Sequence, residues 1–197
     1  MKRLVFCFDG TWNRLDSQYP TNVVLTAESI TPRARHGITQ VIYYDQGVGT
    51  QAGERLRGGA FGVGLERNLT SAYRFLIFNF EPDDEIYVFG FSRGAYMARS
   101  FVGLISNGGI PKRCFADKIT EAVDRYRSRL DDDSYKRGML HFRRDTCPDF
   151  CVSDEEWEWR KQQIRDFDAN AQKRLKIKYL GVWDTVGSLG IPGRWAS

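Results

Sequence analysis

The sequence predicts an α/β fold with a mostly parallel sheet and helices on both of its faces. Two observations favour this class. Short apolar runs typical of strands alternate along the chain with stretches whose apolar residues have helical spacing, and aspartate or serine residues follow directly after three of the short runs. With 197 residues and a hydrophobic content of 42%, the chain can bury one sizeable core. We therefore expect a single domain over residues 1–197.

Four short runs predict the strands of the sheet, at residues 4–8, 40–45, 86–91 and 178–183. The first is apolar throughout, which is typical of a strand buried on both faces, and the second is rich in β-branched and aromatic residues. Asp9, Ser92 and Asp184 each follow one of these strands. Since ligands of parallel α/β sheets bind at the carboxyl ends of the strands, these residues mark the expected functional edge.

Helical spacing of apolar residues predicts helices at residues 22–30, 63–80 and from 93 to a glycine stop at 107–109. A further helix is predicted behind Ser153, which forms a capping-box pattern with Glu156, and an apolar stripe continues this helix to Leu175. Charges of both signs are interspersed over residues 112–176, as on a solvated surface. We interpret this stretch as a charged helical insertion or lid.

The run Gly90-Phe91-Ser92-Arg93-Gly94 matches the pattern G-x-S-x-G. The pattern alone recurs by chance, but here it begins at the end of a strand and opens a helix, which is the setting of a nucleophile elbow. The flanking glycines let the tight turn form and lift the serine oxygen above the sheet. We predict Ser92 as the nucleophile and the amide of Arg93 as an oxyanion donor. The alternative is an ordinary helix start capped by Ser92.

Gly10 and Thr11, in the loop after the first strand, are candidates for the second oxyanion donor, because their amides would face Ser92 across neighbouring strand ends. The same loop also resembles the D-x-D-G-T signature of haloacid dehalogenase-type phosphatases. In that signature the nucleophilic aspartate stands two residues before the second aspartate, and this chain has Cys7 there. The serine hydrolase interpretation is therefore favoured.

Asp184 comes after Ser92, in the order serine, acid, histidine of an α/β-hydrolase triad. Its carboxylate would orient the histidine and stabilise the imidazolium, and the alternative is an aspartate that caps the following turn. His36 and His141 are the two histidines of the chain, and both precede Asp184. Unless His141 swings over the serine, the catalytic base is expected from a missing carboxyl-terminal segment or a partner protein.

Composition excludes several other classes. The net charge of +4 is too small for an electrostatic mode of nucleic-acid binding. The apolar run near the amino terminus is too short for a secretory signal, and no segment has the pattern of a transmembrane helix. We therefore expect synthesis in the cytoplasm, and any export would use a system that does not depend on a signal peptide. The cysteines and histidines form no zinc pattern and the glycine-rich stretch at 47–64 lacks G-K-[ST], so no metal and no cofactor are expected.

Four motifs, in the same order, resemble a bacterial and fungal family of α/β hydrolases that includes phospholipase effectors of type VI secretion. They are FDGTWN at 8–13, YDQGVGT at 44–50, GFSRGA at 90–95 and VWDTVG at 182–187, and they span nearly the whole chain. The resemblance implies Ser92 as nucleophile, Asp184 as triad acid, ester or phospholipid substrates, and a histidine further on. It implies a serine esterase that is cut short at its carboxyl end.

Two other functions stay open. Lacking an evident catalytic histidine, the chain could be an incomplete hydrolase that serves as an interaction module through its charged stretch. Trp157 and Trp159, beside Arg160 and Lys161, could also contact a membrane surface, although a packed helix is the favoured interpretation.

Overall fold

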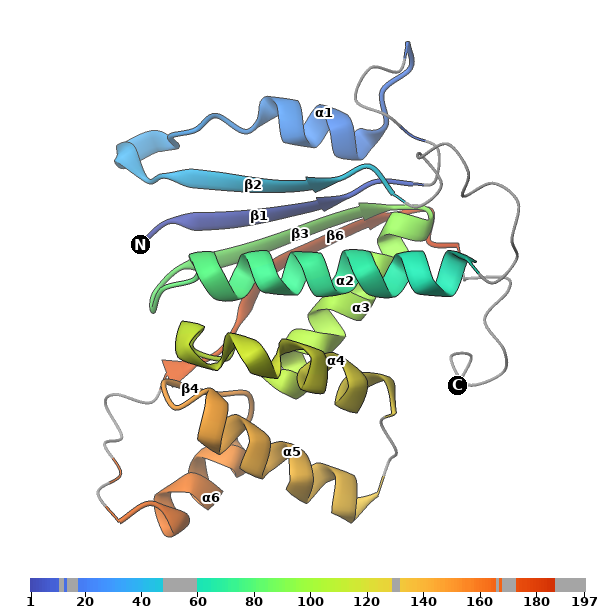
Figure 1. Cartoon of the computed structure of the whole chain (residues 1–197). Helices are drawn as coiled ribbons and strands as arrows, with labels where there is room; N and C mark the ends of the chain where they lie inside the picture. Colours follow the sequence, from blue (N-terminus) through green and yellow to red (C-terminus); the bar gives the residue numbers. More distant parts are fainter. Residues whose placement is uncertain are drawn as a thin grey trace.

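The computed structural model describes residues 1–10, 13, 18–47, 60–128, 132–165, 167 and 173–186. Within them, a four-stranded sheet is formed by β1 (Arg3–Phe8), β2 (Gln40–Asp45), β3 (Glu85–Phe91) and β6 (Ile177–Trp183). The strand order is β2-β1-β3-β6 and every pairing is parallel, so all four carboxyl ends meet at one edge (Figure 1). The predicted α/β class and the four strands are confirmed, and the strand ends agree with the prediction to within one residue.

Helices cover both faces of this sheet. α1 (Asn22–Ser29) lies on one face, and α2 (Ala60–Asn79) and α3 (Arg93–Gly108) lie on the other (Figure 1). Successive side chains of β1 point alternately to the two faces, and both faces are covered, which explains why the whole strand is apolar. Its residues Leu4, Phe6 and Phe8 face α2 and α3, whereas Val5 and Cys7 face α1.

The larger core lies between the sheet and the helices α2 and α3. Aromatic rings dominate its centre, where the ring of Phe6 lies 4.6 Å from that of Phe101 between centroids and 5.8 Å from that of Phe75. Such offset and edge-on contacts add to the free energy gained from apolar burial. This core fixes the direction of α3, and with it the position of the residues that begin α3.

The charged stretch folds into a layer packed against α3. Its elements are η3 (Arg113–Lys118), α4 (Ile119–Arg127), α5 (Asp133–Thr146), β4 (Phe150–Cys151), α6 (Asp154–Gln163) and β5 (Lys173–Arg174). β4 and β5 form a small parallel pair apart from the main sheet, and α6 lies beside α5 (Figure 1). The remaining described element is the short helix η1 (Arg35–Gly37) before β2.

Two expectations for this stretch are wrong. The helix behind Ser153 does not continue to Leu175: α6 ends at Gln163, because the next residue, Ile164, is extended. The charges are also not all solvated, since Glu156 and Arg160 have no exposed surface. α6 is therefore held by buried charges rather than by a long apolar stripe.

Glu156 is the centre of this buried ion cluster. One carboxylate oxygen accepts from Arg160 at 2.7 Å, and the other accepts from Arg143 at 2.9 Å and from the amide of Val152 at 3.1 Å. Arg143 also donates to the carbonyl of Asn107 at the end of α3. Through this cluster, α5, α6 and α3 are tied together.

The tryptophans of α6 are engaged within the same layer. Trp159 meets the ring of His141 edge-on at 5.2 Å, and Trp157 packs edge-on against Phe167 at 5.4 Å with the Lys161 ammonium over its ring. Both side chains are half-buried. These contacts favour the packed helix over a membrane-facing one, although the helix packs on α5 and β4 and not on the main sheet.

Replacing Glu156 by alanine should lower the free energy of unfolding by about 3–5 kcal/mol, because two arginines would be left buried without their shared carboxylate. Urea unfolding checks this. Glu158→Ala, an exposed position on the same helix, serves as the control and should change stability by no more than about 0.5 kcal/mol. Equal effects of the two substitutions would contradict the assigned role of the cluster.

Candidate active site

Ser92 occupies a strained turn between β3 and α3. Its φ of 54° and ψ of −119° lie outside the usual regions for a residue with a side chain, and its hydroxyl makes no capping hydrogen bond. An ordinary N-cap serine has an extended backbone and accepts from a first-turn amide, so Ser92 does not act as one. Strained backbone of this kind is typical of a nucleophile elbow. The Ser92 side chain is half-buried and so is not sealed in the interior.

Close packing explains why glycines flank this serine. A Cβ atom on Gly90 would lie 2.5 Å from the carbonyl oxygen of Gly94, and one on Gly94 would lie 2.2 Å from that of Phe8. Side chains cannot be accommodated at such distances from backbone atoms. The turn at residues 90–94, called the elbow below, therefore requires small residues where β3, α3 and the end of β1 meet.

Asp184 lies beside the elbow at the end of the neighbouring strand. The amide of Ser92 donates to the carbonyl of Trp183 at 2.9 Å, and the amide of Val186 donates back to the carbonyl of Ser92 at 3.4 Å. Asp184 lies between these two partners, is exposed, and has a φ of 46°. The structure thus brings the predicted nucleophile and the predicted acid to adjacent strand ends.

The predicted oxyanion residues have different environments. Arg93 is the first residue of α3, where the helix amino end favours negative charge. Gly10 lies at the end of β1, and its amide donates to the Asp9 carboxylate at 2.7 Å. Thr11 lies outside the described residues.

Asp9 is a buried carboxylate for which sequence analysis gave no role beyond its place at a strand end. It is 1% exposed and accepts hydrogen bonds from Gly10, from the hydroxyl of Thr21 at 2.9 Å and from that of Tyr44 at 2.7 Å. Burial, followed by the hydrogen bond to Asp9, raises the pKa of Tyr44 above its ordinary value. Tyr44 therefore stays protonated and remains a donor to Asp9.

A third carboxylate, Asp45, ends β2 on the same edge. It accepts from the amide of Gly47 at 3.0 Å and from the side chain of Asn68 at 2.9 Å, and burial raises its pKa. The crevice between Asp45 and Arg93 has a volume of about 10 Å³. Such a crevice has room for about one water molecule.

Neither histidine lies near the elbow. His36 is exposed in η1, ahead of β2 and so at the amino edge of the sheet, with the roughly 20 Å length of a six-residue strand between it and the carboxyl edge. His141 lies two residues before Arg143, which binds the far end of α3. The 16 residues of α3 span about 24 Å, which separates that end from Ser92.

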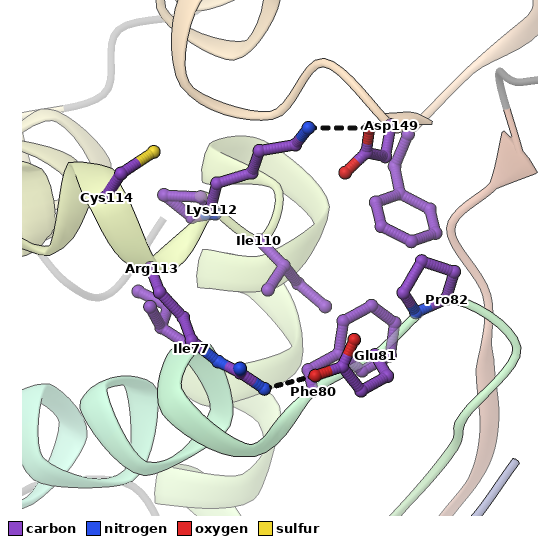
Figure 2. A pocket seen from close by; sticks show the side chains of 11 residues that line it. Ile77, Phe80, Glu81, Pro82, Ile110, Lys112, Arg113, Cys114 and Asp149 are labelled. Carbon is purple, nitrogen blue, oxygen red and sulfur yellow. Dashed lines mark hydrogen bonds and ion pairs between the residues drawn. The ribbon is translucent and has the colours of Figure 1, made fainter.

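A larger hollow of about 330 Å³ lies between the end of α2 and the start of β3, and so at the opposite, amino edge of the sheet. Figure 2 shows the side chains that line it. Apolar side chains such as Ile77, Phe80 and Ile110 form its walls. Ion pairs cross its rim, one between Lys112 and Asp149 at 3.0 Å and one between Arg113 and Glu81. It shares no lining residue with the elbow.

The structure shows no group of metal-ligating side chains within the described residues. Cys7, which stands where the haloacid dehalogenase signature has its nucleophilic aspartate, is fully buried, and burial together with Asp9 raises the pKa of its thiol to about 12. It is therefore not poised for nucleophilic attack. In the described part of the chain, no helix combines the length and the apolar character that crossing a membrane requires.

A parallel sheet with a strained serine turn between a central strand and its helix defines an α/β-hydrolase-like domain. The chain belongs to the family of type VI secretion phospholipase effectors described as Tle1-like, catalytic domain, whose model matches residues 2–197. It is 28% identical over 205 residues to the uncharacterized protein YEL023C of Saccharomyces cerevisiae. That match covers 96% of this chain but 27% of the yeast protein. No solved structure matches the chain.

Gly94→Ala should destabilise the protein by about 2 kcal/mol or more, because the added methyl group meets the Phe8 carbonyl and the backbone must shift. Gly138→Ala in α5 is the matched control. Its added Cβ would meet only the end of the Arg125 side chain, at 3.5 Å. Removing that helical glycine should be neutral or stabilising by up to about 1 kcal/mol. Urea unfolding of both variants tests this, and a neutral Gly94→Ala would contradict the packing account of the elbow.

Proposed function

We propose that the chain carries the nucleophile and acid of a serine esterase that cleaves carboxylic esters, with phospholipids as the substrate class. The observation that carries the proposal is the strained turn at Ser92 beside the end of the strand that leads to Asp184. Membership of a phospholipase effector family supports a lipid ester as the substrate. It also fits export of the protein from the cell in which it is made.

The reaction would proceed through an acyl-enzyme. The Ser92 oxygen attacks the ester carbonyl carbon while its proton passes to a histidine, and the resulting oxyanion accepts hydrogen bonds from the amide of Arg93 and a second donor. Collapse of this intermediate breaks the ester bond, and the alcohol leaves with the proton. Water then attacks the acyl carbon and gives up a proton to the same base. Collapse of this second intermediate releases the acid, and the base returns the proton to the Ser92 oxygen.

Asp184 would hold the histidine in the required tautomer and stabilise its charged form. Its exposure suits this role, because a base that approaches from outside can reach it. The contacts of His36 and His141 lie far from the elbow, so we propose that the base comes from outside these 197 residues. The second oxyanion donor would be Thr11 rather than Gly10, since the Gly10 amide donates to Asp9.

A second candidate function follows from the same placement of the histidines. Without a base, the chain would act as an interaction module that keeps the hydrolase sheet. Residual catalysis separates the two candidates, because serine hydrolases that lack one triad member still retain rates about 10³–10⁴-fold above water.

Ser92→Ala should abolish covalent labelling by a fluorophosphonate probe, because the serine oxygen is the atom that displaces fluoride from phosphorus. Asp184→Asn should slow labelling by about tenfold or more when a histidine-bearing partner segment is supplied, since the acid acts through that base. Ser29→Ala, at an exposed serine of α1, is the control and should label at the rate of the unaltered chain. The measurement is the time course of probe incorporation by mass spectrometry, and equal labelling of Ser92→Ala and the unaltered chain would remove Ser92 from the mechanism.

A further inference from the structure

Two residues at the ends of the segment between β1 and α1 bind one carboxylate. Gly10, its first residue, donates its amide to Asp9 Oδ1, and Thr21, just beyond its last residue, places its hydroxyl 2.9 Å from both Asp9 oxygens. Thr21 is also the N-cap of α1, where its oxygen accepts from the amide of Val24 at 3.2 Å. One hydroxyl thus joins Asp9 to the start of α1.

Asp9 is tied to the sheet as well as to the loop. Tyr44, at the end of β2, donates its hydroxyl to Asp9 Oδ2 at 2.7 Å, and the amide of Asp9 donates to the carbonyl of Asp45 at 2.9 Å. A buried carboxylate is unfavourable unless it is well supplied with donors, and three side-chain and backbone donors surround this one. The carboxylate therefore has a fixed position relative to the ends of β1 and β2.

The backbone of Asp9 lies against the elbow. A Cβ atom on Gly94 would lie 2.5 Å from the Asp9 carbonyl oxygen, and one on Gly47 would lie 2.7 Å from the same atom. The ends of β1 and β2 and the start of α3 are thus in direct contact around Asp9. A displacement of Asp9 would be transmitted at once to the turn that carries Ser92.

We propose that Asp9 is a positioning residue for the reaction at Ser92: its carboxylate, by binding Gly10, Thr21 and Tyr44, holds the end of β1 against the elbow. It touches neither the substrate nor the reacting atoms, and it acts through its own backbone, against which Gly94 packs. The proposal rests on the proposed esterase function, but the placement of Gly10 by Asp9 can be measured without activity.

Asp9→Asn keeps the size of the side chain and removes its charge, so it is the direct test. With the same histidine-bearing segment supplied to each variant, the limiting rate constant of Ser92 phosphonylation should fall by about tenfold or more, because a small misplacement of a catalytic group can cost about 100-fold. The probe concentration at half-saturation should not change. Amide hydrogen exchange, measured by NMR, should become faster at Gly10. An unchanged rate constant together with unchanged Gly10 exchange would overturn the proposal.

Thr21→Ser and Thr21→Val are a matched pair that keeps and removes the hydroxyl bonded to Asp9. Serine should retain the rate constant of the unaltered chain, and valine should lower it. Tyr44→Phe removes the other side-chain donor without removing the cap of α1, and it should lower the rate constant as well. If Asp9→Asn does not fold, these three variants decide the question, and equal rates for Thr21→Ser and Thr21→Val would count against Asp9.

The labelling of Ser92→Ala tests the esterase proposal independently of Asp9. If the unaltered chain and Ser92→Ala label equally, the esterase proposal fails, and Asp9 is then judged by Gly10 exchange alone. Faster exchange in Asp9→Asn would leave Asp9 as the residue that positions Gly10, and unchanged exchange would overturn that as well.

Discussion

The arrangement of the carboxyl edge depends on one steric constraint, the contact of the Ser92 turn with the end of β1. Gly94 lies against the carbonyl oxygens of Phe8 and Asp9, and Gly90 lies against the carbonyl of Gly94. Because neither glycine carries a side chain, β3 and α3 can approach β1 this closely, and the chain makes the tight turn that includes the unusual backbone of Ser92. The aromatic core behind α3 maintains this approach.

Three aspartates lie at the same edge in environments that suit different tasks. Asp9 is buried and surrounded by donors, so its oxygens are occupied by the fold itself. Asp45 is half-buried, holds Gly47 and Asn68, and has a raised pKa. Asp184 is exposed beside the hydrogen-bond partner of Ser92. Of the three, Asp184 is the carboxylate that an incoming imidazolium could reach without dismantling the edge.

The sequence was sufficient for the sheet and the elbow because both depend on local signals. The apolar run of β1 and the glycines around Ser92 can each be recognised from a few neighbouring residues, without knowledge of the rest of the fold. The burial of Glu156 and Arg160 had no such signal, because a buried ion pair and a solvated one look identical in a charge pattern. Asp9 was located correctly at a strand end, but its partners Thr21 and Tyr44 lie 12 and 35 residues away in the chain. Long-range hydrogen bonds of this kind require the fold to be known.

The same geometry limits what the charged layer of residues 112–176 could do as a lid. Its described attachments to the rest of the domain lie on two helices: Arg127 of α4 pairs with Glu66 of α2, and Arg143 binds the carbonyl of Asn107 at the far end of α3. About 24 Å of helix separate this anchor from Ser92, and the buried charges of Glu156 fix the layer there. A layer that closed over the elbow would have to break these ion pairs or extend along α3. Anchoring of α2 and α3 is therefore the role that these described contacts support.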